Sequence, residues 1–190
     1  MSSVGPQSPA TGGQLILPGN PWDDAPVQAS DNTRGACVVG FLDVDGAYSE
    51  YIFGREFDFS AIPADSIIDG IKVEWERSGT NDGGGCYDAT VKLLKRSGTS
   101  PVAVGSNLSA GALWPATDAY ESFGGATSLW GTTWTVAEIQ DAMFGCELLM
   151  VVPNYDSSGE TGYVDHVRIT VWYHAPASDD GGPKRIIMLM

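Results

Sequence analysis

The chain has 190 residues, 43% of them hydrophobic, which fits one domain with a sizeable core, with or without extensions. Its 24 acidic and 10 basic residues give a net charge of −14, which argues against nucleic acid and anionic membrane surfaces as direct partners because both need a cationic face. The 24 glycines and 11 prolines predict many short strands joined by turns.

Residues 1–21 predict a flexible N-terminal arm. Small and polar residues dominate it, and its one apolar cluster, Leu15-Ile16-Leu17, is too short for a core element and predicts an edge strand or a docking peptide. The first 13 residues lack the basic and apolar regions of a secretory signal peptide, so export by that route is not expected. No apolar run approaches the roughly 18 residues that cross a bilayer, so no membrane partner is expected.

Residues 22–174 predict a domain built from about seven or eight strands. In the clearest one, Ile71–Arg77, apolar side chains alternate with charged ones, which is typical of a half-buried antiparallel strand. Glu147–Val152 is a continuous apolar run and predicts a central strand buried on both faces. Gly54 predicts a bulge or bend. The strands expected from these patterns are Glu50–Phe59, Ile71–Arg77, Ala89–Lys95, Glu147–Val152 and Asp165–Tyr173.

One short helix is expected near residues 136–143. Thr135 and Glu138 have the spacing of a capping box, in which each side chain satisfies a backbone donor at a helix start. Phe144-Gly145 follows, where glycine can adopt the left-handed conformation that ends a helix. Long strands without βαβ spacing and with this single helix predict an all-β protein, an antiparallel two-sheet β-sandwich of jelly-roll-like topology.

The segment 175–190 reads as a linker followed by an apolar tail. Residues 175–183 are rich in Ala, Pro, Ser, Asp and Gly, and Lys184-Arg185 then precede five apolar residues. Exposed, such a tail favours aggregation. Two interpretations stand: it docks onto another subunit by strand addition, or it folds back as an edge strand of its own domain. The candidate assembly contacts are Leu15, Ile16, Leu17, Ile186, Ile187, Met188, Leu189 and Met190.

Motifs that carry catalysis or bind a cofactor are not found. The chain has no nucleophile elbow, HExxH zinc motif, P-loop or Rossmann glycine pattern, and Gly83–Gly85 predicts a flexible loop. His166 and His174 have no second ligand at metal spacing and are interpreted as surface or sheet-face residues. Three separated cysteines favour free thiols over one disulfide and a leftover thiol. We therefore expect no enzyme activity and no cofactor.

Acidic and aromatic side chains leave binding alternatives open. Glu74 and Glu76, like Asp43 and Asp45, alternate as a glycosidase pair could, but also as an ordinary solvated strand face does. Calcium has possible oxygen ligands at Asp23-Asp24, Asp31-Asn32 and 154–160, although turn chemistry explains these residues without a metal. A set of aromatics could stack on sugars, but core packing is favoured for them: Trp114, Tyr120, Phe123, Trp130 and Trp134.

Segments between Trp22 and Tyr173 resemble, in order and spacing, a family of small β-sandwich structural proteins of tailed bacteriophages. The loop 79–86, the three cysteine positions, the arm and the tail lie outside this resemblance. The segments that carry it are Trp22, Ala29–Asn32, Phe57–Pro63, Ile67–Glu74, Asp88–Leu93, Gly105–Asn107, Trp114-Pro115, Phe123–Gly125, Leu129–Gly131, Trp134-Thr135 and Phe144-Gly145.

The resemblance implies a non-enzymatic virion component, a capsid decoration or cement protein. Such a protein is made in the host cytoplasm and released by lysis, so it needs no signal peptide. Its expected partners are the major capsid protein or other virion proteins and further copies of itself, in a homotrimer at capsid threefold sites. The alternative is a carbohydrate-binding module on a phage fibre or tail surface, with glycans as partners.

Overall fold

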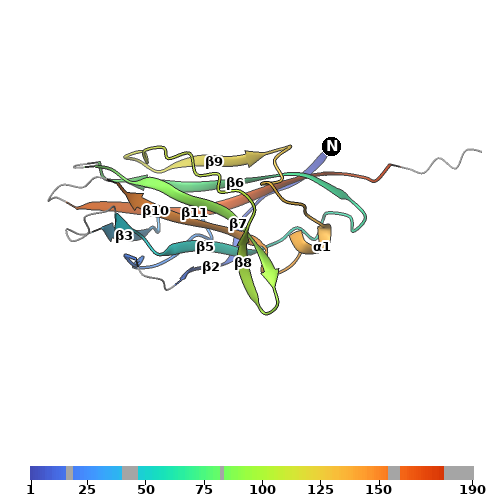
Figure 1. Cartoon of the computed structure of the whole chain (residues 1–190), viewed down its shortest axis with the longest axis horizontal. Helices are drawn as coiled ribbons and strands as arrows, with labels where there is room; N and C mark the ends of the chain where they lie inside the picture. The colour runs from blue at the N-terminus through green and yellow to red at the C-terminus, as the bar shows by residue number, and fades with distance from the viewer. Residues whose placement is uncertain (16–18, 40–46, 82–83, 154–158, 178–190) are drawn as a thin grey trace, which may run out of the picture.

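The computed structural model describes residues 1–15, 19–39, 47–81, 84–153 and 159–177. They form two antiparallel sheets packed face to face (Figure 1), which confirms the predicted two-sheet, jelly-roll-like β-sandwich. The strands are β1 (Ser2–Gln7), β2 (Pro9–Leu15), β3 (Gly35–Val39), β4 (Ala47–Tyr48), β5 (Tyr51–Phe57), β6 (Ile67–Gly79), β7 (Tyr87–Ser97), β8 (Ser100–Val104), β9 (Ala119–Gly125), β10 (Gly145–Val152) and β11 (Glu160–His174), with one helix, α1 (Val136–Ile139).

Consecutive strands alternate between the two layers. Sheet A has the order β1-β11-β6-β9, with β3 also paired to β11, and sheet B has the order β2-β5-β10-β7-β8, with β4 also paired to β10. The chain therefore crosses from one sheet to the other at almost every connection, as in a jelly roll. All five strands expected from the sequence patterns are present, and each differs from the expectation at one or both ends.

The core lies between the two sheets. Ile71, Val73 and Trp75 of β6 are buried and point inward, as their alternation predicted. From β10, Cys146, Leu148, Met150 and Val152 point inward, and the other face of this strand is only partly covered. β10 is thus central in its sheet, with β5 and β7 as neighbours, but it is not fully buried on both faces.

The expected N-terminal arm, residues 1–21, differs from the structure. Most of it forms β1, which pairs with β11, and β2, which pairs with β5. Its Gly, Ser, Thr and Pro residues lack the alternating apolar pattern of a strand, so these edge strands are held mainly by backbone pairing to longer neighbours. The first residues of the chain therefore belong to the sandwich, one strand to each sheet.

Gly54 is not a bulge. It pairs in register with Gly12 on one side and Cys146 on the other. A Cβ atom at this position would lie 2.6 Å from Cγ1 of Val167 in the opposite sheet. The glycine is therefore required by the close approach of the two layers. Its strand is irregular instead at Glu56, which has a φ of 60°.

The helix is shorter than predicted, although its start is as expected. Thr135 and Glu138 form the capping box. The helix ends at Ile139 because Asp141 accepts a hydrogen bond from the backbone N–H of Met143 (2.7 Å), a local turn that competes with helix continuation. Gly145 does not cap it; it begins β10, where it lies against the carbonyl of Gly54.

Around this helix, aromatic residues close one end of the sandwich. Trp130 is buried, and its indole N–H donates to the carbonyl of Ile71 (2.9 Å). Trp134 packs edge-on against Phe144, with ring centroids 5.4 Å apart, and Phe59 packs on the same ring at 5.9 Å. Among the described residues, no helix is long and apolar enough to cross a membrane.

Candidate functional site

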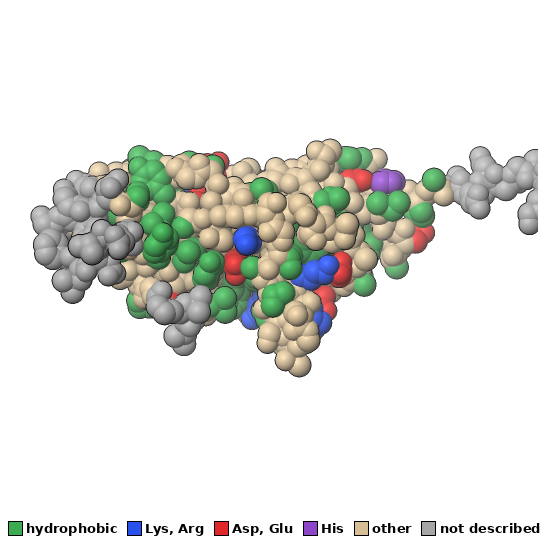
Figure 2. Space-filling model, viewed as in Figure 1, with side chains coloured by type: hydrophobic (Ala, Val, Ile, Leu, Met, Phe, Trp, Pro, Cys, Tyr) green, Lys and Arg blue, Asp and Glu red, His purple; other side chains and the backbone are tan. Residues whose placement is uncertain are grey.

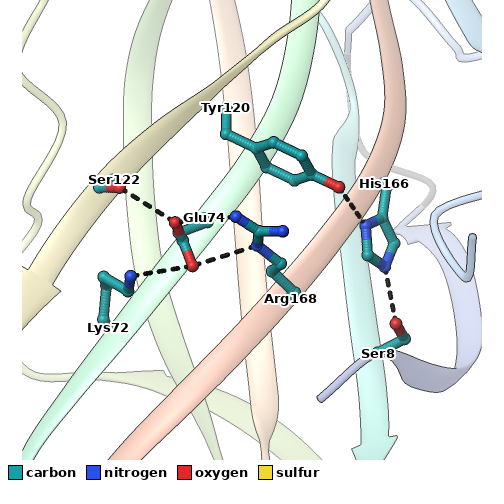
Figure 3. Close-up of polar contacts among 7 residues, drawn as sticks. All are labelled: Ser8, Lys72, Glu74, Tyr120, Ser122, His166 and Arg168. Carbon is teal, nitrogen blue, oxygen red and sulfur yellow. Dashed lines mark hydrogen bonds and ion pairs between the residues drawn. The ribbon is translucent and has the colours of Figure 1, made fainter. Parts of the chain in front are cut away.

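A network of polar side chains covers the outer face of sheet A (Figure 3). Glu74 of β6 accepts two hydrogen bonds from the guanidinium of Arg168 on β11, at 3.1 and 3.2 Å. Lys72 lies 3.1 Å from the same carboxylate, and Ser122 of β9 donates to it at 3.4 Å. Burial would raise the pKa of Glu74, but the bonds from Arg168 and Lys72 outweigh it and hold the pKa below its usual value.

His166 extends this network toward the N-terminal strands. Its Nδ1 lies 2.7 Å from the hydroxyl of Tyr120, and its Nε2 lies 2.9 Å from the hydroxyl of Ser8. Burial lowers the pKa of His166, so a neutral ring joins the two hydroxyls near pH 7. The guanidinium of Arg168 lies 3.9 Å from the centroid of the Tyr120 ring. The side chains of this face thus bind one another across β6, β9 and β11 and reach Ser8 between β1 and β2.

The positions of Glu74 and Glu76 can now be compared with the glycosidase pair that the sequence left open. Glu74 and Glu76 lie on the same face of one strand, as cross-strand partners of Arg168 and His166. Both oxygens of Glu74 are engaged by basic groups. Their placement agrees with the interpretation of a polar strand face. Asp43 and Asp45 lie outside the described residues.

The described side chains proposed as calcium ligands already accept backbone hydrogen bonds. Asp23 accepts the backbone N–H of Ala36 at 2.6 Å, and Asp31 accepts that of Thr33 at 2.9 Å. Residues 154–158 lie outside the described part of the chain. Among the residues that the structure describes, no group of three or more His, Cys, Asp or Glu side chains is arranged to hold a metal ion.

The aromatic side chains considered as a sugar-stacking platform are mostly core residues. Trp114, Trp130, Trp134 and Phe123 are buried, and Tyr120 is bonded to His166. This confirms the core interpretation.

Trp114 also donates to Asp88 (2.9 Å), which forms a buried ion pair of 2.7 Å with Arg77. His174 lies at the exposed end of β11, with Nδ1 2.7 Å from Asp69. The three cysteines are free, as predicted, and all three are buried.

The outer face of sheet B has a pocket with a mainly apolar lining. A pocket of about 200 Å³ is formed by side chains from all five strands of the main path. We call it the sheet-B pocket, and its lining residues are Leu15, Phe53, Arg55, Leu94, Pro101, Ala103 and Glu147. The space-filling view shows hydrophobic side chains gathered over the region of β5, β7 and β10 (Figure 2).

Two charged side chains, Arg55 and Glu147, lie in the lining of the sheet-B pocket. The guanidinium of Arg55 lies 4.5 Å from the centroid of the Phe53 ring, which it covers. Glu147 is buried, and its burial raises its pKa to about 7, offset only in part by the charge of Lys92. The pocket therefore offers an apolar lining with a carboxyl group that is poorly compensated.

Of the predicted assembly contacts, the structure describes Leu15 alone. It ends β2, is 38% exposed and lines the sheet-B pocket. Ile16, Leu17 and Ile186–Met190 lie outside the described residues. The sequence did not predict that the other pocket residues lie together, because they come from separate strands. Glu147, a charged residue at the start of an apolar run, was the one available signal.

Comparison with known proteins identifies no family. No family model and no curated protein matches the chain. A solved structure described as "CBM4 structure and function" matches with a TM-score of 0.38 and 8% identity over 74% of this chain and 85% of that one. A crystal structure of domains CD of another protein matches with a TM-score of 0.45 and 13% identity over 84% of this chain and 63% of that one. Likenesses this loose carry no information on what the chain binds.

Proposed function

We propose that this chain is a non-enzymatic structural protein of a tailed-phage virion, a capsid decoration or cement protein. The observation that carries the proposal is the sheet-B pocket, an apolar surface open to a partner at which the predicted contact residue Leu15 lies. The polar clusters of the opposite face are bonded among themselves instead. The resemblance of Trp22–Tyr173 to phage β-sandwich proteins supports the virion assignment.

In this role the protein acts by burying apolar surface against its neighbours. Burial contributes about 25 cal/mol per Å² of apolar surface removed from water. Its partners are the major capsid protein and further copies of itself, in a homotrimer. It is made in the host cytoplasm and reaches the outside when the cell lyses. The net charge of −14 favours solubility of the free subunits.

Quantitative mass spectrometry of purified particles tests the proposal. A decoration protein is expected in a copy number comparable to that of the major capsid protein. A number of a dozen or fewer would place the protein in the neck, tail or fibre and overturn the decoration role. Absence from particles would overturn the virion role altogether.

Deletion of residues 186–190 adds a test of the assembly segments. The truncated domain is expected to fold, because the described strands do not include these residues, and to enter particles about tenfold less well, corresponding to about 1.4 kcal/mol of binding. Circular dichroism checks the fold. Normal incorporation of the truncated protein would remove this segment from the assembly.

A carbohydrate-binding role is the second candidate, and one feature favours it. Tyr48 of β4 and Tyr87 of β7 are both cross-strand partners of Val151 on β10, so two partly or fully exposed aromatic rings flank one position on sheet B. Exposed aromatic rings commonly stack on sugars. Binding in a glycan panel that Tyr48→Ala abolishes would support this role, and a panel without any binding would count against it.

A further inference from the structure

Large exposed apolar side chains lie on both layers of the sandwich: Val38 (62% exposed) and Ile67 (47%) belong to strands of sheet A, and a slightly larger group accompanies sheet B. Four of the seven in the described residues lie on sheet B or beside it: Leu15 (38% exposed), Tyr48 (45%), Val102 (42%) and Leu113 (49%), the last bridged to Tyr87. On the outer face of sheet A, the side chains around Glu74 form an ion-pair network instead. Exposed apolar patches of this kind mark sites of protein association.

The sheet-B pocket includes Leu15 of this group in its lining, and its size suits aliphatic side chains. Its volume of about 200 Å³ accommodates one or two of them. The face of Phe53 is covered by Arg55 at 4.5 Å, and its ring edge meets Gly13. This ring is therefore not free to stack on a sugar, and the pocket suits an apolar peptide better than a glycan.

The charges at the pocket favour an occupant that carries a cation next to its apolar residues. Glu147 makes no hydrogen bond to another described residue, and Lys92 on the neighbouring strand lowers its pKa only in part. Arg55 lines the same pocket, but its guanidinium lies over the Phe53 ring and forms no ion pair with Glu147 among the described residues. A second positive group near this carboxylate would stabilise its ionised form. The overall charge of −14 adds a general attraction for basic segments.

One segment of this chain has that chemistry. Lys184-Arg185 stand directly before Ile186-Ile187-Met188-Leu189-Met190, so a basic pair adjoins a run of flexible and branched aliphatic side chains. We propose that the sheet-B pocket receives residues 184–190 of a second copy of the chain, with aliphatic side chains in the pocket and the basic pair beside Glu147. This inference rests on the proposed structural role and names the acceptor for its assembly segment.

The course of the chain favours a neighbouring copy over the same copy. β11 belongs to sheet A, whereas the pocket opens on the outer face of sheet B. Seven Cα-to-Cα steps join Ala177 to Lys184, and these span at most about 25 Å when fully extended. To reach its own pocket the segment would have to pass around an edge of the sandwich, a constraint that a neighbour's pocket does not impose.

Disulfide cross-linking tests this contact. Ala103 is exposed on the rim of the pocket, so A103C in a tagged chain is mixed with I187C in an untagged chain and oxidised. Ala119, an exposed alanine on β9 of the opposite sheet, provides the matched control A119C. The native cysteines are buried, and each single variant alone measures their background.

We expect the A103C and I187C chains to form a mixed dimer about tenfold more than the A119C and I187C chains, as specific proximity raises the effective concentration of the thiols. Equal cross-linking with both partners would overturn the contact. A bond formed only when one chain carries both A103C and I187C would show docking within a chain and overturn the second-copy assignment.

This experiment separates the contact from the proposed virion role. Cross-linking is measured on the purified full-length protein, without particles. A specific mixed dimer together with absence from purified particles would leave the contact standing and remove the virion role. High copy number in particles without specific cross-linking would leave the virion role and remove this contact.

Discussion

Glu147 is a buried carboxyl group in a mainly apolar pocket lining. It stands opposite Phe53 on β5 and Lys92 on β7. Burial raises its pKa to about 7, so near neutral pH this side chain is divided between its protonated and ionised forms. Such a residue weakens the isolated domain at the pH where the carboxylate is charged, and that cost is removed when a cation covers it.

Replacement of this residue by glutamine is expected to stabilise the protein in a pH-dependent way. The folded-state pKa is about 7, against an ordinary value of 4.5, so the contribution of Glu147 to stability is fully present below pH 4.5. It is lost as the pH rises from 4.5 to 7. At pH 8, E147Q should be more stable than the parent by about 3 kcal/mol, and at pH 4 the two should be similar.

Urea unfolding at pH 4, 6 and 8 measures this difference. The exposed Asp65 has no partner among the hydrogen bonds and ion pairs of the described residues, so D65N controls for the loss of one negative charge. A stability difference between E147Q and the parent that does not change with pH would contradict the assignment.

At the scale of the element, α1 shows how a helix of four residues is held in place. Its start is fixed by the capping box of Thr135 and Glu138, with bonds of 3.2 and 2.9 Å. Glu138 also forms an ion pair with Lys95 of β7, and Gln140 donates to the carbonyls of Phe59 and Ile62 at 3.1 and 2.9 Å. So short a helix depends on these bonds rather than on its own propensity.

Thr135→Ala is therefore expected to destabilise the domain by about 1 kcal/mol, because the backbone N–H of Glu138 loses its acceptor. Thermal unfolding followed by tryptophan fluorescence measures the change, since Trp134 adjoins the cap. The exposed Thr133 makes the matched control T133A, expected to change the stability by less than about 0.5 kcal/mol. Equal effects of the two substitutions would show that the cap does not hold this segment.

The sequence predicted elements where side chains alternate, and missed them where backbone pairing dominates. Ile71–Arg77 and Asp165–Tyr173 were recognisable because one face of each strand is buried against the other sheet. β1 and β2 were not, since their glycines and hydroxyl residues carry no such pattern. The sheet-B pocket could not be predicted because its residues meet only through pairing between strands far apart in the sequence. Of its lining, only Leu15 was expected to be a contact residue.

At the scale of the molecule, one buried ion pair joins the two layers. Arg77 on β6 of sheet A contacts Asp88 on β7 of sheet B at 2.7 Å, and both side chains are almost completely buried. Trp114 donates to the second oxygen of Asp88 and lies under the guanidinium, 5.1 Å from ring centroid to Cζ. The burial of Asp88 raises its pKa despite the opposing effect of Arg77.

Replacing one residue of this ion pair should therefore lower the free energy of unfolding more than replacing both. Asp88→Ala leaves Arg77 charged, buried and unpaired, and is expected to destabilise the protein by about 3–5 kcal/mol. The double variant R77M/D88L, with apolar side chains of similar size, should lose much less. Urea unfolding compares the two, and a double variant as unstable as Asp88→Ala alone would contradict this account of the pair.

The pairing of β1 with β11 has a consequence for how the protein is made. The partners Ser3 and Trp172 are separated by most of the chain, and a ribosome adds about 5–20 residues per second. The first strand therefore waits roughly ten seconds or more for its partner to be synthesised. Neither sheet can be completed on the ribosome before β10 and β11 emerge, so apolar strands of the growing chain remain uncovered during that interval. Chaperone binding to the nascent chain is expected to matter more for this sandwich than for a helical protein of the same length, whose contacts are local.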